Sequence, residues 1–132
     1  MTTKNPIPGD IAALPVDLTG QRVIVTAGAA GIGAAIAGGF AARGAQVHIW
    51  DVDERALAAC PHPWSRADVS QRDQIDRYMQ EALARLGGLD VLVNNAGIAG
   101  PTAGIADIAP QELDAPLDIN LASEFHTLRP AL

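Results

Sequence analysis

Apolar residues along the chain follow two spacings in alternation, which predicts strands followed by helices. Continuous apolar runs at residues 22–26, 46–51 and 89–94 are short, as is typical of strands buried on both faces of a sheet. A weaker strand is predicted at residues 65–68. Because helical patterns separate these runs, the order predicts an α/β fold with a doubly wound parallel sheet.

The segment after the first strand predicts an amphipathic helix. Ile32, Ile36 and Phe40 recur at helical spacing, and Gly44 marks the C-terminal end of the pattern. A shorter helix is expected at residues 53–60, where two prolines follow. These helices would connect neighbouring parallel strands.

Two longer helices are predicted further along the chain. Ser70 is the expected N-cap of the first, with Asp73 three residues later as in a capping box. Pro116 interrupts the last helix and predicts either a kink or a start later than Pro110. Their apolar stripes are Ile75, Met79, Ala82, Leu83 and Leu86 in the first, and Leu113, Leu117, Leu121, Phe125 and Leu128 in the last.

Length and composition leave room for one domain. We expect an irregular arm at residues 1–20, which holds three prolines, and a folded domain at residues 21–132. The net charge of −6 argues against a nucleic-acid partner, and no apolar run reaches the length of a membrane span. Cys60 is the only cysteine, which excludes an intrachain disulfide and a cysteine metal cluster and favours a reducing cytoplasm. No metal site is expected.

Polar residues stand at the ends of the predicted strands. Thr26, Asp51, Asp68 and Asn94 each follow an apolar run. Right-handed crossovers place the carboxyl ends of parallel strands at one edge of the sheet, so these four side chains are expected to face one crevice.

A glycine-rich turn joins the first strand to the first helix. Glycines let the backbone approach a bulky anion, and the free N–H groups and dipole of the helix N-terminus favour negative charge. A pyrophosphate is the expected ligand. The alternative is a turn that only lets the helix pack close to the sheet. The residues assigned to this contact are Gly28, Ala30, Gly31, Ile32 and Gly33.

Asp51 is the candidate for nucleotide recognition at the end of the second strand. It lies eighteen residues after Gly33, where a carboxylate can accept hydrogen bonds from the ribose hydroxyls of an adenosine. The carboxylate would repel a 2′-phosphate. Val52 follows it and the turn holds no Arg or Lys, so NAD is favoured over NADP. The alternative is that Asp51, like Asp53, caps the short helix.

The other two strand ends carry further candidate contacts. Asp68 can lie beside the adenine amino group with Val69 against the ring, or be a loop aspartate before the helix cap. Asn95 can bond the backbone across a crevice, and Ala96 and Gly97 leave space for a flat ligand. The alternative for the latter segment is an ordinary turn at the end of a strand.

In order and spacing, these motifs resemble the short-chain dehydrogenase/reductase family. The resemblance implies a Rossmann-type fold, here truncated after the fourth strand and the following helix, and hydride transfer between NAD(P) and an alcohol or carbonyl. The matching segments are Thr26-Ala27-Gly28-Ala29-Ala30-Gly31-Ile32-Gly33, Asp51, Asp68-Val69, Asn94-Asn95-Ala96-Gly97 and Ile119-Asn120-Leu121.

The resemblance also implies a role for each motif. The glycine turn would bind the pyrophosphate side, Asp51 the adenosine ribose, and Asp68 with Val69 the adenine. The segment from Asn95 through Ala96 to Gly97 would line the ribose of the nicotinamide half. Asn120 would stand at the family's proton-relay position.

The sequence departs from the family pattern at several positions, among them Ser123, which stands three residues after Asn120 where the family often has glycine. Ala27 stands where the family usually has glycine, and we expect it to need only a negative φ. The serine and the Tyr-x-x-x-Lys pair of the family are absent, since the only tyrosine is Tyr78, with Ala82 four residues later. Proton transfer contributes roughly 10²–10⁴-fold in enzymes, so the chain by itself is expected to be catalytically inactive.

Three hypotheses follow for the function. The first is the cofactor-binding half of an NAD-dependent alcohol dehydrogenase or ketone reductase, with a small-molecule substrate used only by a full-length parent. The second is a non-catalytic NAD-binding or regulatory module, and the third is an inactive structural fragment. A fourth strand without a further neighbour, together with the last helix, predicts self-association.

Overall fold

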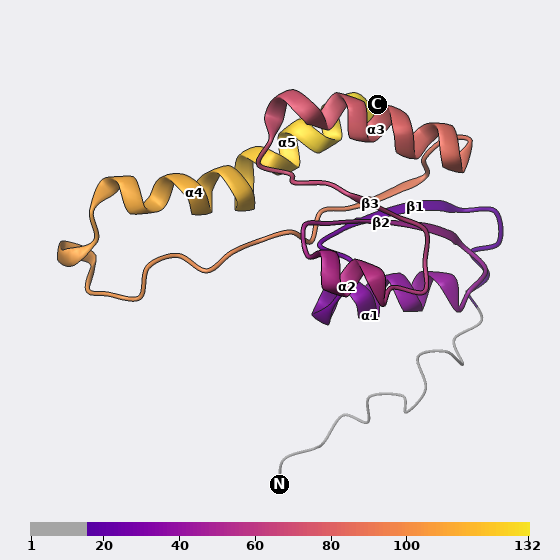
Figure 1. Cartoon of the computed structure of the whole chain (residues 1–132), viewed down its shortest axis with the longest axis horizontal. Coiled ribbons are helices and arrows are strands. Elements are labelled where there is room, and N and C mark those ends of the chain that lie inside the picture. Colours follow the sequence, from indigo (N-terminus) through magenta and orange to yellow (C-terminus); the bar gives the residue numbers. More distant parts are fainter. Residues whose placement is uncertain (1–15) are drawn as a thin grey trace, which may run out of the picture.

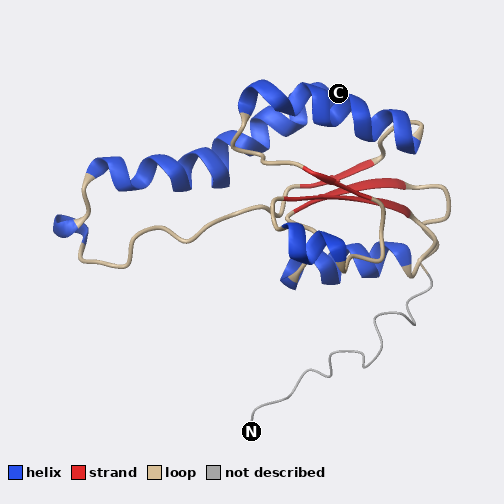
Figure 2. Ribbon diagram, viewed as in Figure 1, coloured by secondary structure: helices blue, strands red, loops and turns tan. Residues whose placement is uncertain are grey.

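Four parallel strands lie in the middle of the molecule with helices on both faces (Figures 1 and 2). The computed structural model describes residues 16–132, so most of the predicted arm falls outside the described residues. The doubly wound parallel sheet is confirmed. Its strands are β1 (Arg22–Thr26), β2 (Gln46–Asp51), β3 (Trp64–Arg66) and β4 (Val91–Val93), in the spatial order β3-β2-β1-β4.

Each face of the sheet carries its own part of the core. Helices α1 (Gly31–Ala41) and α2 (Glu54–Ala58) cover one face, and α3 (Arg72–Leu86) and α5 (Ser123–Leu128) cover the other (Figure 1). Because successive side chains of a strand point to opposite faces, Val25 packs in the α1 cluster and Ile24 in the α3 cluster. Both are fully buried, which is why the middle of β1 is apolar at consecutive positions.

Helices α2 and α3 begin differently from one another. Asp53 caps α2 as expected, and its carboxylate accepts two backbone N–H groups of the first turn at 2.9 and 3.1 Å. The predicted capping box of α3 is wrong, because Gln71 holds the N-cap position without a side-chain bond. The Ser70 hydroxyl instead donates to Asp68 Oδ1 at 2.7 Å, since the nearby carboxylate is the stronger acceptor.

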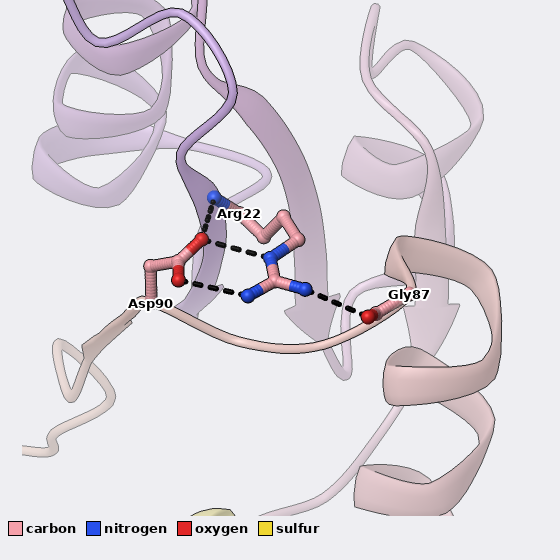
Figure 3. A network of polar contacts seen from close by, with 3 residues as sticks. All are labelled: Arg22, Gly87 and Asp90. Carbon is pink, nitrogen blue, oxygen red and sulfur yellow. Dashed lines mark hydrogen bonds and ion pairs between the residues drawn. The ribbon is translucent and has the colours of Figure 1, made fainter.

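An ion-paired network joins β1 to the turn between α3 and β4 (Figure 3). Arg22 Nε and a second guanidinium nitrogen donate to the two oxygens of Asp90 at 2.8 Å, and a third nitrogen donates to the Gly87 carbonyl at 2.7 Å. The bonds from Arg22 lower the pKa of Asp90 to about 2. Gly88 adopts φ +144° beside the guanidinium, where a Cβ would overlap it. This network fixes the register in which Val23 pairs with Val91.

The last helical segment changes its winding along its length. After η2 (Ile105–Asp107) and η3 (Pro110–Leu113), α4 (Asp114–Leu117) is followed by π-helical η4 (Asp118–Ala122), then α5 and η5 (Arg129–Ala131). Pro116 falls in the first turn of α4, where its missing N–H has no helical partner to lose. The helix therefore starts later than Pro110, which is the second of the two predicted outcomes.

The β4 side of the sheet is open within the described part of the chain. There β4 pairs only with β1, and it is three residues long, shorter than the predicted run at 89–94. The part labelled α4 projects away from the sheet, whereas α5 lies beside α3 (Figure 1). Among residues 16–132, no helix combines the length and the apolar character that crossing a membrane requires. The exposed apolar stripe of this segment is Leu113, Leu117, Leu121, Phe125 and Leu128.

Candidate functional site

The carboxyl ends of the strands form one crevice, as their polar residues predicted. It contains a cavity of about 130 Å³ between the ends of β1, β2 and β4 and the loop after β3. Six of the predicted cofactor contacts share this cavity. Its lining consists of Ala27, Asp51, Val52, Ala67, Asp68, Val69, Ala96, Gly97, Ile98 and Ile119.

The glycine turn is shaped by close packing on both sides. A Cβ on Gly28 would lie 2.8 Å from the Ile49 side chain, and a Cβ on Gly33 would overlap the Ala27 carbonyl. Gly31 adopts φ +54°, a backbone region that favours glycine. Larger residues at Gly28 and Gly33 would push the helix away from the sheet.

The N-terminus of α1 suits an anion. The helix begins at Gly31 with no side-chain cap, and its first turn has no acidic residue. Its first N–H groups therefore lack intrahelical partners while carrying the positive end of the helix dipole. Ile32, which follows, is 75% exposed at this end, so its side chain contributes little to the core. These features fit the pyrophosphate predicted for the turn.

The backbone conformation of Ala27 differs from the one we expected. It adopts φ +48°, although we expected a negative φ. The carbonyl of Ala27 accepts a hydrogen bond from Asn95 Nδ2 at 3.1 Å, and it lies over Gly33. This left-handed conformation costs a residue with a Cβ roughly 1 kcal/mol, and glycine would avoid that cost.

Asp51 links the end of β2 to the glycine turn. Its Oδ2 accepts the Ala29 N–H at 3.0 Å, and its Oδ1 accepts the N–H groups of Val52 at 2.8 Å and Asp53 at 3.0 Å. A carboxylate offers about four lone-pair sites, so one site on Oδ2 is available to a ribose hydroxyl. Asp53, and not Asp51, caps α2.

Asp68 has its predicted loop role and also lines the cavity. Its Oδ1 accepts the Ser70 N–H at 2.9 Å and the Ser70 hydroxyl at 2.7 Å, which is the loop role. The same residue lines the cavity together with Val69, whose side chain is almost fully buried. The cavity thus has a carboxylate beside an apolar wall, as adenine recognition requires.

Thr26 and Asn95 tie β4 to the end of β1. The Thr26 hydroxyl accepts the N–H groups of Asn95 at 2.9 Å and Ala96 at 3.0 Å. Asn95 Nδ2 donates to the carbonyls of Thr26 and Ala27, both at 3.1 Å. The Asn95 side chain therefore bonds backbone across the crevice, and Ala96 and Gly97 line the cavity. The sequence analysis placed Thr26 at the crevice but did not predict these hydrogen bonds of its hydroxyl. A polar residue at the end of a buried strand is the signal that could have revealed them.

Asn120 fastens the loop after β4 to the last helical segment. Its Oδ1 accepts the Ile98 N–H at 2.8 Å, and its Nδ2 donates to the Ile98 carbonyl at 2.9 Å. The end of β4 is also joined to the last helical segment by a hydrogen bond that the Thr127 hydroxyl donates to Asn94 Oδ1 at 2.8 Å. Ile98 and Ile119 complete the cavity wall, a contact that the sequence pattern did not reveal.

Tyr78 and His48 do not line the crevice. Tyr78 is largely buried in the core, where it packs edge-on against Trp50 and its hydroxyl donates to Gln74 at 2.6 Å. His48 is fully buried, and burial followed by the charge of Arg85 lowers its pKa to about 4. Within residues 16–132, no group of three His, Cys, Asp or Glu side chains is placed to hold a metal ion.

A parallel sheet with a glycine turn, a carboxylate ending β2 and a cavity at the strand ends defines a Rossmann-type fold. The family model for short chain dehydrogenase matches residues 21–132. The chain therefore belongs to the short-chain dehydrogenase family, whose members bind NAD(P) and small-molecule substrates.

Similar proteins agree with this assignment. The chain is 41% identical over 126 residues to a hydroxy-methyl-oxo-hexahydro-indene-carboxyl-CoA reductase of Mycobacterium tuberculosis, covering 87% of the chain and 48% of that protein. It is 38% identical over 124 residues to D-beta-hydroxybutyrate dehydrogenase of Cupriavidus necator, with the same coverage of 87% and 48%. The chain thus spans about half the length of the curated relatives it matches.

Similar solved structures have the same fold, and the chain again covers about half of their length. A short-chain type dehydrogenase/reductase from Mycobacterium marinum superposes with a TM-score of 0.81 at 31% identity, covering 87% of this chain and 50% of that one. A short chain dehydrogenase from Mycobacterium smegmatis gives a TM-score of 0.80 at 32% identity, covering 88% and 53%.

Proposed function

We propose that this chain binds NAD at the crevice and represents the cofactor-binding half of an oxidoreductase acting on an alcohol or carbonyl. The observation that carries the proposal is the link between Asp51 and the glycine turn. The bond from the Ala29 N–H to Asp51 positions the turn and the ribose acceptor together, at one cavity. A turn that served only helix packing would not need this carboxylate.

Different residues of the crevice contact different parts of the cofactor. The N–H groups at the start of α1, from Gly31 onward, face the pyrophosphate, and the free site on Asp51 Oδ2 accepts a ribose hydroxyl. Asp68 and Val69 bound the adenine, while Ala96 and Gly97 leave space toward the nicotinamide half. The bound nicotinamide supplies the hydride acceptor or donor.

The same carboxylate favours NAD over NADP. A 2′-phosphate would bring negative charge beside Asp51, which lines the cavity together with the apolar Val52. No Arg or Lys lies in the turn from residue 27 to 33 to compensate that charge. A tenfold preference corresponds to about 1.4 kcal/mol, a modest value for repulsion between charges in direct proximity.

Catalysis needs groups that the crevice of this chain does not supply. The Tyr78 hydroxyl donates a hydrogen bond to Gln74 in the core, and the Asn120 side chain is hydrogen-bonded to the backbone of Ile98. We propose that the chain by itself binds NAD without turnover, and that a full-length parent carries out hydride transfer on a small alcohol or carbonyl. The names of the relatives include a CoA-linked substrate and a hydroxybutyrate, both of which fit that class.

Calorimetric titration with NAD⁺ and NADP⁺ tests the cofactor proposal. We expect NAD⁺ to bind and Asp51→Ala to weaken its affinity at least about tenfold. Asp51→Asn, which removes the charge and keeps an acceptor, should bring the two cofactors closer in affinity. Asp53→Ala is the matched control, because it removes the neighbouring carboxylate that caps α2 outside the cavity.

Two outcomes would overturn this proposal. One is the absence of NAD⁺ binding at millimolar concentration to a chain that unfolds cooperatively. The other is an equal loss of affinity in the Asp51→Ala and Asp53→Ala variants, which would make both carboxylates merely structural.

We also propose that copies of the chain associate through the open β4 side. Leu121 and Phe125 are about two-thirds exposed there, at 64% and 65%. Leu121→Asp should shift sedimentation toward the monomer, whereas Ile105→Asp, at a 92% exposed position off the apolar stripe, should not. If the unsubstituted chain sediments as a monomer at every concentration, this surface does not drive association.

A further inference from the structure

A second cavity lies at the end of the sheet opposite the glycine turn. It has a volume of about 450 Å³ and is bounded by the start of β2, the segment before β3 and the C-terminal end of α3. The carboxyl end of β2 carries Asp51, so the two cavities lie at opposite ends of this strand. Its volume falls within the range of small-molecule pockets, about 300–1,000 Å³.

The charged group of this cavity is cationic. Arg85 lines it, and its guanidinium forms no ion pair or hydrogen bond with the described residues. His62 lines it as well, and its ring likewise has no hydrogen-bond partner in the described part of the chain. No carboxylate is among the lining residues. A lone guanidinium beside an unbonded imidazole suits an anion.

His48 adds a buried polar group without a partner. The residue is fully buried at the cavity boundary, and its Nε2 lies 2.9 Å from the Ser65 hydroxyl. Its Nδ1 has no hydrogen-bond partner among residues 16–132. Burial and the charge of Arg85 lower the pKa of His48 to about 4, so the imidazole is neutral at pH 7. Buried polar atoms without partners are rare in native proteins. Because this nitrogen is closed to solvent, it adds polarity behind the cavity wall and does not contact the ligand directly.

The remaining walls of the cavity are mainly apolar. Pro63 and Leu86 provide this surface. A small inorganic anion would use the guanidinium and leave these walls in contact with water. A molecule with one anionic group and a short hydrocarbon body would satisfy both parts of the site.

We propose that this cavity binds a small organic monocarboxylate. Arg85 and His62 hold the carboxylate, and the hydrocarbon body packs against Pro63 and Leu86. The site is distinct from the cofactor crevice and does not depend on the proposed function.

Hexanoate is the probe for this site, followed by amide chemical shifts of the full chain at pH 7. We expect hexanoate to shift resonances at the start of β2 and the end of α3. Arg85→Gln should weaken its affinity at least about tenfold, and His62→Ala should weaken it severalfold. Arg77→Gln, on the same helix but outside the cavity, is the matched control and should bind as the unsubstituted chain does. Hexylamine, which has the same body and the opposite charge, should not bind.

Four results would overturn the proposal. Hexanoate could fail to bind, or Arg85→Gln could bind it unchanged. Inorganic phosphate could bind as tightly, which would show an anion site without apolar recognition. Saturating NAD⁺ could displace hexanoate, which would place it in the cofactor crevice. Hexanoate binding in a chain that does not bind NAD⁺ would support this site while refuting the proposed function.

Discussion

The two sides of β1 differ in how completely they are packed. On the β2 side, Ile49 and Trp50 are fully buried between helices on both faces. On the β4 side, the three residues of β4 are only half-buried, and Leu121 beyond them is 64% exposed. Similar apolar patterning in the sequence therefore produces a core in one place and an exposed surface in the other.

The cavity proposed to bind the cofactor lies across this boundary, yet most of its candidate contacts come from the packed side. The glycine turn and Asp51 belong to β1, α1 and β2, where backbone and side chains are held by the core. Ala96 and Gly97 come from the open side, and the bonds of Thr26 to that segment attach it to the packed side. The proposed recognition of the adenosine half therefore does not depend on the open β4 edge.

The largest expected difference between the two sides concerns stability. Ile49→Ala should lower the free energy of unfolding by roughly 2–5 kcal/mol, because it leaves a cavity in the core. Leu121→Ala should change it by less than about 0.5 kcal/mol, since the side chain is exposed. Urea unfolding of the two variants at low protein concentration measures both. A comparable loss in Leu121→Ala would show that the apolar stripe is packed after all.

The packed side should also respond to pH through His48. The lowered pKa, about 4 against 6.5 in the unfolded chain, means that the unfolded state binds more protons between these values. The contribution of neutral His48 to stability is therefore complete above pH 6.5 and is lost as the pH falls toward 4. In His48→Phe, the urea midpoint should fall less steeply over this window. An unchanged slope in that variant would mean that other groups cause the pH dependence.

Much of the packed side could be predicted from the sequence, because local spacing determines it. The order of strands and helices, the turn before α1 and the position of Asp51 all follow from patterns within a few residues. The cap at Asp53 follows in the same way. These features need no knowledge of distant contacts.

The errors and omissions involve competition or distant partners. Ser70 was expected to cap α3, but Asp68 competes for its hydroxyl. The bonds of Asn120 to Ile98 join segments 22 residues apart, which no local pattern reveals. The backbone of Ala27 depends on Asn95, which lies 68 residues further along the chain. Sequence spacing identifies which residues reach the crevice, but not which of them bond to one another.

The smallest expected effect concerns this same residue, Ala27. Ala27→Gly should raise the free energy of unfolding by roughly 0.5 kcal/mol, because relief of the Cβ penalty at φ +48°, about 1–2 kcal/mol, exceeds the freedom that glycine adds to the unfolded chain. The matched control is Ala29→Gly two residues later, where φ is not positive. That change should lower stability by roughly 0.5–1 kcal/mol, since it only adds freedom to the unfolded chain. Opposite signs would locate the strain at the single position where β1 turns into the cofactor site, whereas a loss of stability in both variants would show that Ala27 is relaxed.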